Sequence, residues 1–238
     1  MYHHLNSDRC SNDYAIFETH LAYISQHYTT LFPTDDKLPK NPICLVFDDG
    51  YYDFYKLTFP LLKKYNLKAL LAVVPSVTLE KSTQTETVRL APEHNELFNE
   101  FQNGTFCSYE ELQEMQQSGH VQIASHSLTH VNLLEESADV TKELKESKEI
   151  LEQKLGVSVD SFVFPFGKYN QQILEETQKY YKYAFRIGNG INRDFKGING
   201  VIYRIDGDNL KDAHSVFSLK NMLRYAFKTL IKKVAGNR

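Results

Sequence analysis

The chain has 238 residues, of which 42% are hydrophobic and 24% are charged, and its formal net charge is −3 at pH 7. This composition is typical of a soluble globular protein with a sizeable core. The weak negative charge argues against nucleic acid as a partner, because phosphate binding needs a concentrated basic face. Cys10, Cys44 and Cys107 form no CxxC pair, which favours free thiols in a reducing compartment.

Short apolar runs alternate with amphipathic segments along the chain, and Gly, Pro and capping residues mark several of their ends. Ser108 begins one helix, Gly156 ends another, and Pro60 starts or kinks a turn. In chain order the sequence predicts a helix over 17–26, a strand over 43–47, a helix over 55–65, a strand over 69–74, a helix over 109–119, a strand over 121–124, a helix over 140–155, a strand over 162–164, a helix over 170–182, and strands over 183–186 and 201–205.

The alternation of strands and helices predicts an α/β fold with a largely parallel sheet, either open or closed into a barrel. No Gly/Ser/Pro-rich linker divides the chain, so we expect one domain over residues 1–215, with a polar insertion at about 78–105 and a flexible Gly/Asn-rich loop at 188–200. Residues 1–6 lack the basic and apolar regions of an export signal, and no apolar stretch approaches the roughly 20 residues of a membrane span. A cytoplasmic location is therefore expected.

Two adjacent carboxylates, Asp48 and Asp49, follow the strand predicted at 43–47 and precede Gly50. In parallel α/β folds, ligands bind at this end of the strands. Adjacent like charges raise one pKa unless a cation or a donor compensates. A metal held by one carboxylate and a proton-accepting role for the other resolve the conflict. The alternative is a solvated turn with an Asp N-cap.

His126 and His130 follow the strand predicted at 121–124. Their i, i+4 spacing places both imidazoles on one face if a helical turn begins there. Two histidines and one carboxylate, with positions left for water and substrate, are typical of a catalytic zinc-like site. Because both segments follow strands of the same predicted sheet, together they favour a metal site more strongly than either does alone.

FDDG followed by HSLTH resembles the first two motifs of the polysaccharide deacetylases, the NodB-type carbohydrate esterases of family 4. The resemblance spans roughly residues 45–205 and implies a distorted (β/α)7 barrel. It also implies that Asp48 is the general base and that Asp49, His126 and His130 hold a divalent metal, with zinc expected and cobalt or nickel as alternatives.

The family's third motif, Arg-x-Pro-Tyr, is matched in type by Pro165 and Phe166, whereas its arginine is replaced by a hydrophobic residue. By analogy with the family, the backbone N–H of Phe166 stabilises the tetrahedral oxyanion. Without the motif arginine, Asp48 needs another partner. Arg186 and Arg204, each at the end of a predicted strand, are candidates, although both could be ordinary structural arginines.

The family's late Leu-x-His motif, whose histidine serves as general acid, has no clear match. His214 is the nearest histidine, but no apolar strand leads into it. The remaining candidates for the proton donor are His3, His4 and a proton returned from Asp48. Family members often begin their first strand with a Tyr-His pair, so His3 and His4 are also candidates for the pocket. His94 and His120 are expected at the surface.

The reaction implied by the resemblance is metal-assisted removal of an N-acetyl group from an acetamido sugar. Such sugars include nucleotide-linked monosaccharides and lipid-linked precursors of surface polysaccharides such as O-antigen or capsule. A carbohydrate-binding protein with weak or no activity, and an amide hydrolase with a non-sugar substrate, stay open as alternatives. A phosphatase is disfavoured, since its acids are generally spaced as DxD. The sequence leaves the oligomeric state open.

Residues 216–238 combine an apolar stripe with many Lys and Arg residues, which predicts a basic amphipathic helix. A helix of this kind can lie on an anionic membrane surface, here the inner face of the membrane. The alternative is a helix that packs on the barrel and keeps a solvated, charged outer face.

Overall fold

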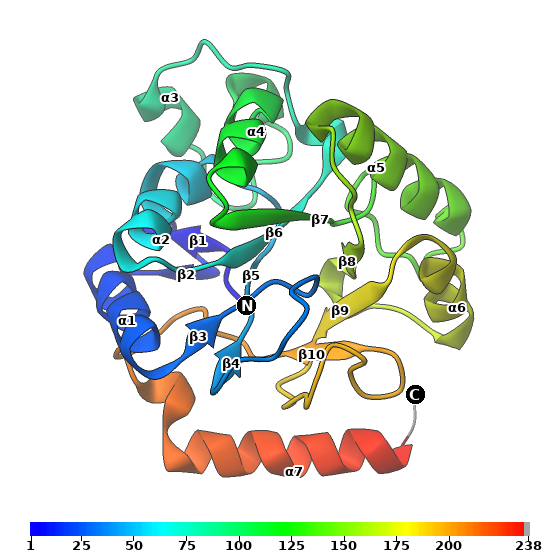
Figure 1. The fold of residues 1–238 in the computed structure, drawn as a ribbon. Helices are drawn as coiled ribbons and strands as arrows, with labels where there is room; N and C mark the ends of the chain where they lie inside the picture. Colours follow the sequence, from blue (N-terminus) through cyan, green and yellow to red (C-terminus); the bar gives the residue numbers. More distant parts are fainter. Residues whose placement is uncertain (236–238) are drawn as a thin grey trace.

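Six parallel strands form the centre of the protein in a computed structural model, which describes residues 1–235 (Figure 1). Neighbours in the sheet are neighbours in the chain, and each pair is parallel. The strands are β5 (Leu45–Phe47), β6 (Ala69–Val73), β7 (Val121–Ser125), β8 (Ser161–Val163), β9 (Tyr183–Ile187) and β10 (Ile202–Arg204). Each lies within a residue or two of a predicted strand.

Residues 1–2 close this sheet between its two edges. Tyr2 pairs in parallel with Phe47 at the β5 edge. On the β10 side, the Met1 nitrogen donates to the Ile205 carbonyl at 2.5 Å, and the Gly207 N–H donates to the Met1 carbonyl at 2.9 Å. The sheet is therefore a nearly closed barrel. The predicted distorted α/β barrel is confirmed, with residues 1–2 in the place of a seventh strand.

The strands bury most residues on both of their faces, which explains why their sequences are largely apolar. Val46, Leu70 and Ala124 belong to a cluster of strand residues inside the barrel. Their neighbours Leu45 and Phe47 instead join a larger cluster with the surrounding helices. Successive side chains of a strand point to opposite faces, so one short apolar run serves both layers.

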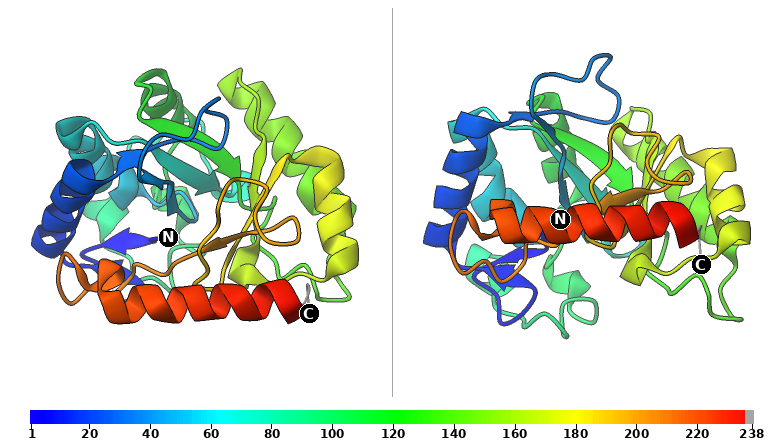
Figure 2. Two further views of the ribbon diagram at one scale, coloured as in Figure 1. Left: turned by 60° about the horizontal axis from the view of Figure 1, so that its bottom comes forward. Right: turned by 90° about the horizontal axis from the view of Figure 1, so that it is seen from below.

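Helices surround the barrel on its outside (Figures 1 and 2). They are α1 (Tyr14–His27), α2 (Phe59–Tyr65), α4 (Tyr109–Gln117), α5 (Val140–Leu155) and α6 (Gln171–Tyr180). Ser108 forms a capping box with Glu111 at the start of α4, and Gly156 ends α5 with φ 69°. The helix predicted over 55–65 is a π-helical turn (Phe54–Thr58) followed by α2. Pro60 has no N–H to continue the ladder of hydrogen bonds.

Two small parallel pairs complete the strands. They are β1 (His4–Leu5) with β2 (Ser11–Asn12), and β3 (Thr29–Thr30) with β4 (Pro42–Ile43). The strand predicted over 43–47 is therefore interrupted at Cys44, between β4 and β5. Since β1 follows directly on residues 1–2, the chain that closes the barrel also carries His3 and His4 to its edge.

The polar insertion at 78–105 contains α3 (Glu86–Leu90) and is anchored by a buried arginine. The Arg89 guanidinium donates to the Glu111 carboxylate at 2.6 and 2.8 Å, and to the carbonyls of Gly104 at 2.6 Å and Phe106 at 3.1 Å. A buried guanidinium with this many acceptors holds a loop in one place. The insertion therefore has a fixed position on the barrel.

The C-terminal helix α7 (Leu219–Ala235) runs along the outside of the barrel, at the bottom in Figure 1. Residues 236–238 of the predicted helical segment lie outside the described residues. Among residues 1–235, no helix combines the length and the apolar character needed to cross a membrane.

Tyr2 also anchors the closing segment through a buried hydrogen bond. Its hydroxyl lies 2.8 Å from Nε2 of His20, whose Nδ1 lies 2.7 Å from the Ala213 carbonyl. Burial lowers the pKa of His20, so the ring is neutral. Nδ1–H then donates to Ala213, and Nε2 accepts from Tyr2.

We expect Tyr2→Phe to lower the free energy of unfolding by about 1–3 kcal/mol, because it leaves the buried Nε2 of His20 without a donor. Urea denaturation measures the change. Tyr65→Phe is the control, since its hydroxyl donates to Glu18 at 3.2 Å in a half-buried position that water can reach. A Tyr2→Phe variant as stable as the wild type would contradict this role.

Candidate active site

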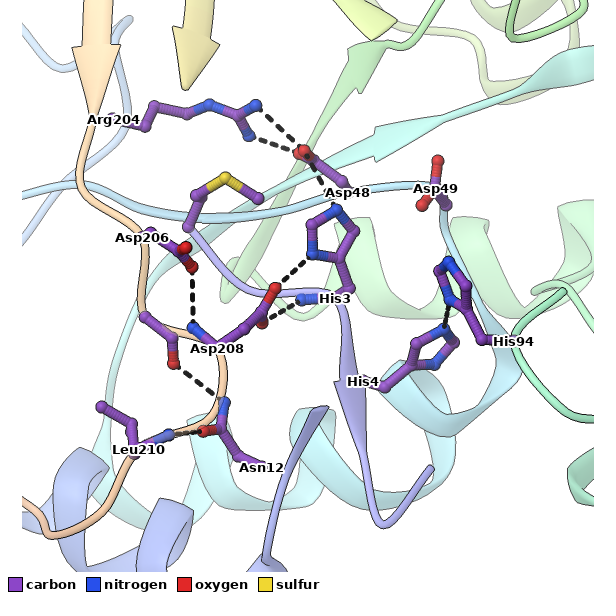
Figure 3. Close-up of polar contacts among 12 residues, drawn as sticks. His3, His4, Asn12, Asp48, Asp49, His94, Arg204, Asp206, Asp208 and Leu210 are labelled. Atoms are coloured by element: carbon purple, nitrogen blue, oxygen red, sulfur yellow. Dashed lines mark hydrogen bonds and ion pairs between the residues drawn. The ribbon is translucent and has the colours of Figure 1, made fainter. Parts of the chain in front are cut away.

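β5 ends in two adjacent, buried carboxylates that face different neighbours (Figure 3). Asp49 has φ 69° and Gly50 has φ 75°, and the Gly50 N–H donates to the Asp48 carbonyl at 2.9 Å. Aspartate tolerates the left-handed region better than most residues, and glycine adopts it freely. This tight turn separates the two carboxyl groups, so each meets its own set of partners.

Asp49 faces the two motif histidines. Its Oδ1 lies 3.4 Å from Nε2 of His126 and 3.2 Å from Nε2 of His130. One ligand atom from each of the three residues can be chosen so that all lie within 4.8 Å of one another. The predicted metal ligands therefore converge in space.

The chemistry of these donors fits a divalent cation. Nδ1 of His126 lies 2.7 Å from the Val163 carbonyl, which fixes that ring and turns Nε2 toward Asp49. Burial lowers the pKa of His126 to about 4, so its Nε2 is a lone-pair acceptor at neutral pH. Asp49 Oδ1 is buried and has no hydrogen-bond donor among the described residues. A cation between His126 Nε2 and Asp49 Oδ1 would satisfy both atoms.

The segment 126–130 is an irregular loop and not the helical turn that its spacing could have formed. Ser127 and His130 have φ of 63° and 59°, and the His130 N–H donates to Ser127 Oγ at 3.0 Å. Glu143 of α5 accepts from the backbone N–H groups of Leu128 and Thr129, both at 2.9 Å, and from the Thr129 hydroxyl at 2.6 Å. Sequence reasoning missed Glu143, because on a helix it looks like any surface acid.

Asp48 pairs with Arg204 of β10. Both guanidinium NH2 groups donate to its carboxylate, one of them at 2.9 Å, and both side chains are buried. Burial alone would raise the pKa of Asp48, but the charge of Arg204, aided by the protonated His3, holds it well below its usual range. Of the two arginines considered as partners, Arg204 is therefore the one that pairs with Asp48.

His3 joins the same carboxylate from the closing segment. Its Nε2 lies 3.8 Å from Asp48 Oδ2, and its Nδ1 lies 2.6 Å from Asp208 Oδ2 (Figure 3). Burial alone would lower the pKa of His3. The hydrogen bond to Asp208 and the charges of Asp48 and Asp49 outweigh burial and raise this pKa to about 9. His3 is thus protonated at neutral pH. Asp208 was not anticipated from the sequence.

His94 lines the site, contrary to the expectation that it lies at the surface. Its Nδ1 lies 3.1 Å from Nε2 of His4, whose Nδ1 lies 2.9 Å from the buried Asp53. His4 also stacks on Tyr51, with ring centroids 3.9 Å apart. The anchored insertion brings His94 there, a long-range effect that local sequence patterns do not reveal. His4 is therefore fixed between Asp53 and His94.

The other predicted residues divide between the site and the rest of the barrel. Phe166 has φ 55°, is exposed, and stands with its ring centroid 4.7 Å from that of His130, next to the buried Pro165. Arg186 does not contact Asp48, and its guanidinium stacks on Tyr169 and Tyr203.

Two further histidines lie elsewhere. His214 packs against Tyr23 of α1, with ring centroids 4.4 Å apart, and does not line the cavity at Asp48. Its expected role as the acid does not fit this position. His120 bonds the Leu67 carbonyl at 2.9 Å, and it directly precedes β7, whose other end leads to His126.

An open cavity of about 470 Å³ gives access to these groups. Asp48, Asp49, His3 and Arg204 line it together with both motif histidines, and Phe98 and Phe166 supply aromatic walls. Ligand sites of this size commonly combine aromatic surface with a few convergent polar groups. The cavity therefore places the paired Asp48 carboxylate, a candidate metal centre and a protonated imidazole around one space.

A family model described as "Polysaccharide deacetylase" matches residues 35–184, more than half of the chain. The chain belongs to the polysaccharide deacetylase family.

YxkH of Bacillus subtilis (strain 168) is 28% identical over 173 residues, which are 68% of this chain and 53% of that protein. The poly-beta-1,6-N-acetyl-D-glucosamine N-deacetylase of Staphylococcus aureus (strain MRSA252) is 23% identical over 189 residues, 72% of this chain and 59% of that protein. The chain thus spans little more than half the length of these relatives.

The fold is also that of solved deacetylases. The Streptococcus pyogenes deacetylase PplD, solved in complex with acetate, matches with a TM-score of 0.71 at 23% identity, and the match covers 94% of both chains. A polysaccharide deacetylase from Bacillus cereus matches with a TM-score of 0.72 at 23% identity, covering 91% of this chain and 66% of that one. The family expected from the two motifs is therefore confirmed.

We expect Asp49→Ala and His126→Ala to lose bound metal, because each removes one of three ligands, whereas Asp48→Asn keeps it. Elemental analysis of the purified proteins, after loading with zinc and removal of excess ion, measures the content. Asp48→Asn is the matched control, since it changes a buried carboxylate one residue away. Full occupancy in the Asp49 variant would contradict the ligand assignment.

Proposed function

We propose that the protein is a metal-dependent N-deacetylase, which hydrolyses the acetamide of an N-acetylated sugar in a glycan. One observation carries the proposal. Asp49, His126 and His130 converge on a single point, and Asp48, held by Arg204, faces the same cavity. Membership of the polysaccharide deacetylase family supports the reaction class. The name of the Staphylococcus aureus relative supports N-acetylglucosamine polymers as the substrate class.

The proposed metal ligands are Asp49, His126 and His130, with zinc as the ion and cobalt or nickel as alternatives. A divalent ion at this position would lower the pKa of bound water and polarise the acetyl carbonyl. His126 is held in the required orientation by the Val163 carbonyl, and the loop that carries His130 is held by Glu143.

Asp48 is the proposed general base. It takes a proton from the attacking water while the water oxygen bonds to the acetyl carbon. Arg204 fixes the carboxylate through two hydrogen bonds, so that the base does not rotate between the two steps of the reaction. For the oxyanion we propose the backbone N–H of Phe166, which lies in the turn at Pro165–Gly167 beside the cavity.

His3 is the proposed general acid. It has to deliver a proton to the sugar nitrogen as the bond from that nitrogen to the acetyl carbon breaks, which releases acetate and a free amine. Its ring is protonated at neutral pH and lies 3.8 Å from Asp48, so it faces the same reacting atoms. Asp208 holds the far nitrogen of the ring at 2.6 Å and fixes the orientation of the donor.

As the source of the sugar we propose a surface polysaccharide or one of its lipid-linked precursors. The open shape of the cavity supports a chain-like substrate over a fully enclosed monosaccharide. The aromatic side chains of Phe98 and Phe166 at its wall offer apolar surface to the face of a sugar ring.

We expect the zinc-, cobalt- or nickel-loaded protein to release acetate from N-acetylglucosamine oligomers. Asp48→Asn should lower kcat by about 100-fold or more while keeping its metal, because it removes the base. Enzyme-coupled acetate detection, with mass spectrometry of the oligomers, measures both.

The test compares β-1,6-linked oligomers, β-1,4-linked oligomers and a simple N-acetylated amine. Binding of oligomers by the metal-loaded protein without turnover would favour a carbohydrate-binding protein. Turnover of the simple amide alone would favour a non-sugar amidase.

We expect Asp208→Asn to move the alkaline limb of the kcat profile to lower pH by about 1 unit or more. The acid has to be protonated to act, so activity is present below the pKa of His3 and is lost above it. Removing the Asp208 charge lowers that pKa. The acidic limb should stay in place, and Asp212→Asn, whose carboxylate accepts from the His214 N–H, should leave both limbs unchanged. An unmoved alkaline limb in Asp208→Asn would exclude His3 as the acid.

A further inference from the structure

The outer side of α7 exposes a continuous stripe of large apolar side chains. Among the described residues, eleven large hydrophobic side chains are exposed, and six of them lie on this one helix. They are Leu219 (76% exposed), Leu223 (64%), Phe227 (64%), Leu230 (60%), Ile231 (49%) and Val234 (82%). Scattered apolar residues are ordinary on protein surfaces, but a contiguous patch of this kind marks an interaction site.

The stripe points away from the barrel because the opposite side of α7 packs against the barrel. Tyr225 is buried, and Thr229 Oγ1 accepts from the Ile191 N–H at 2.7 Å. Leu223 and Phe227 each precede one of these residues by two positions. At about 100° per residue, they lie on nearly the opposite side of the helix. Figure 2 shows α7 on the outside of the barrel with no other element beyond it.

The charges of α7 are all positive. Its sequence contains five basic residues and no acidic one. Lys220, Arg224 and Lys228 follow each other at intervals of four, so they form a row along one edge of the apolar stripe. Lys233 is exposed, and Lys232 lies over the Tyr203 ring, 4.9 Å from its centroid. An apolar stripe edged by basic residues is the pattern of helices that lie in the plane of a membrane interface.

We propose that α7 docks the protein on an anionic lipid bilayer. The apolar stripe enters the boundary between headgroups and acyl chains, and the basic row meets the phosphates. A helix of 17 residues is about 25 Å long and lies flat on the surface in this arrangement. The proposal does not depend on the chemistry of the active site.

Charge complementarity favours a lipid surface over a second copy of the chain. A symmetric dimer with two antiparallel copies of α7 in this face would bring their basic rows together, and α7 offers no carboxylate to pair with them. Anionic headgroups supply the missing negative charge. Each basic side chain near the surface increases the affinity for the membrane roughly fivefold.

Flotation of the 238-residue protein with vesicles tests the proposal. We expect the protein to float with vesicles of phosphatidylglycerol and phosphatidylcholine, to stay at the bottom with pure phosphatidylcholine, and to dissociate as salt is raised. The double variant Leu223→Glu/Phe227→Glu should lose flotation. The triple variant Lys220→Gln/Arg224→Gln/Lys228→Gln should bind at least tenfold more weakly. Both variants should keep the wild-type melting temperature, because the altered side chains are exposed or, for Lys228, half-buried.

Leu134→Glu is the matched control, since it places a charge on an exposed leucine (45% exposed) away from α7, and it should float like the wild type. Equal binding to neutral and anionic vesicles, or unchanged flotation of the Leu223/Phe227 variant, would overturn the proposal. A third result would also overturn it: the wild type does not float and forms a dimer in analytical ultracentrifugation, and Leu223→Glu/Phe227→Glu dissociates this dimer. A second copy of the chain would then cover the stripe.

Discussion

The buried ion pair between Asp48 and Arg204 is the contact on which the site depends. It joins β5 and β10, the two edge strands of the six-strand sheet, across the seam that residues 1–2 close. A buried charge is tolerated when it is paired and hydrogen-bonded, and losing one partner leaves the other uncompensated. The pair can form only when the barrel closes. Closure of the fold and formation of the Asp48–Arg204 pair are thus one event.

The same closure determines what each carboxylate can do. In the left-handed turn at Asp49 and Gly50, the two carboxylates point in different directions. Asp48 faces Arg204 and His3, and Asp49 faces His126 and His130. Asp48 therefore accepts hydrogen bonds from two guanidinium N–H groups, while Asp49 keeps an oxygen without a hydrogen-bond donor among the described residues. Two neighbouring aspartates therefore have different surroundings, because Asp48 faces the guanidinium of Arg204 and Asp49 faces the imidazole nitrogens of His126 and His130.

The departure from the family motif is compensated in space. The position of the motif arginine is occupied by Val163, which packs inside the barrel. Arg204 supplies the charge from β10, two strands away in the sheet. An arginine on β10 can reach Asp48 because all the strands are parallel and have their carboxyl ends at the same rim of the barrel. A lost motif residue in such a barrel can be replaced from another strand without moving the group that it serves.

The sequence by itself determined the strands, most helices and the expected meeting of Asp49 with His126 and His130. These follow from periodicity, caps and the position of each motif directly after an apolar strand. It left both Arg186 and Arg204 open as partners of Asp48, and the structure shows the contact with Arg204. It did not establish that His3 and His94 line the cavity and that His214 does not. His3 and Asp208 are 205 residues apart, and Arg204 and Asp48 are 156 apart. Such pairs exist only after barrel closure, which no local pattern encodes. The pattern of α7 likewise predicted a helix, and the packing of Tyr225 decided that its apolar stripe faces outward.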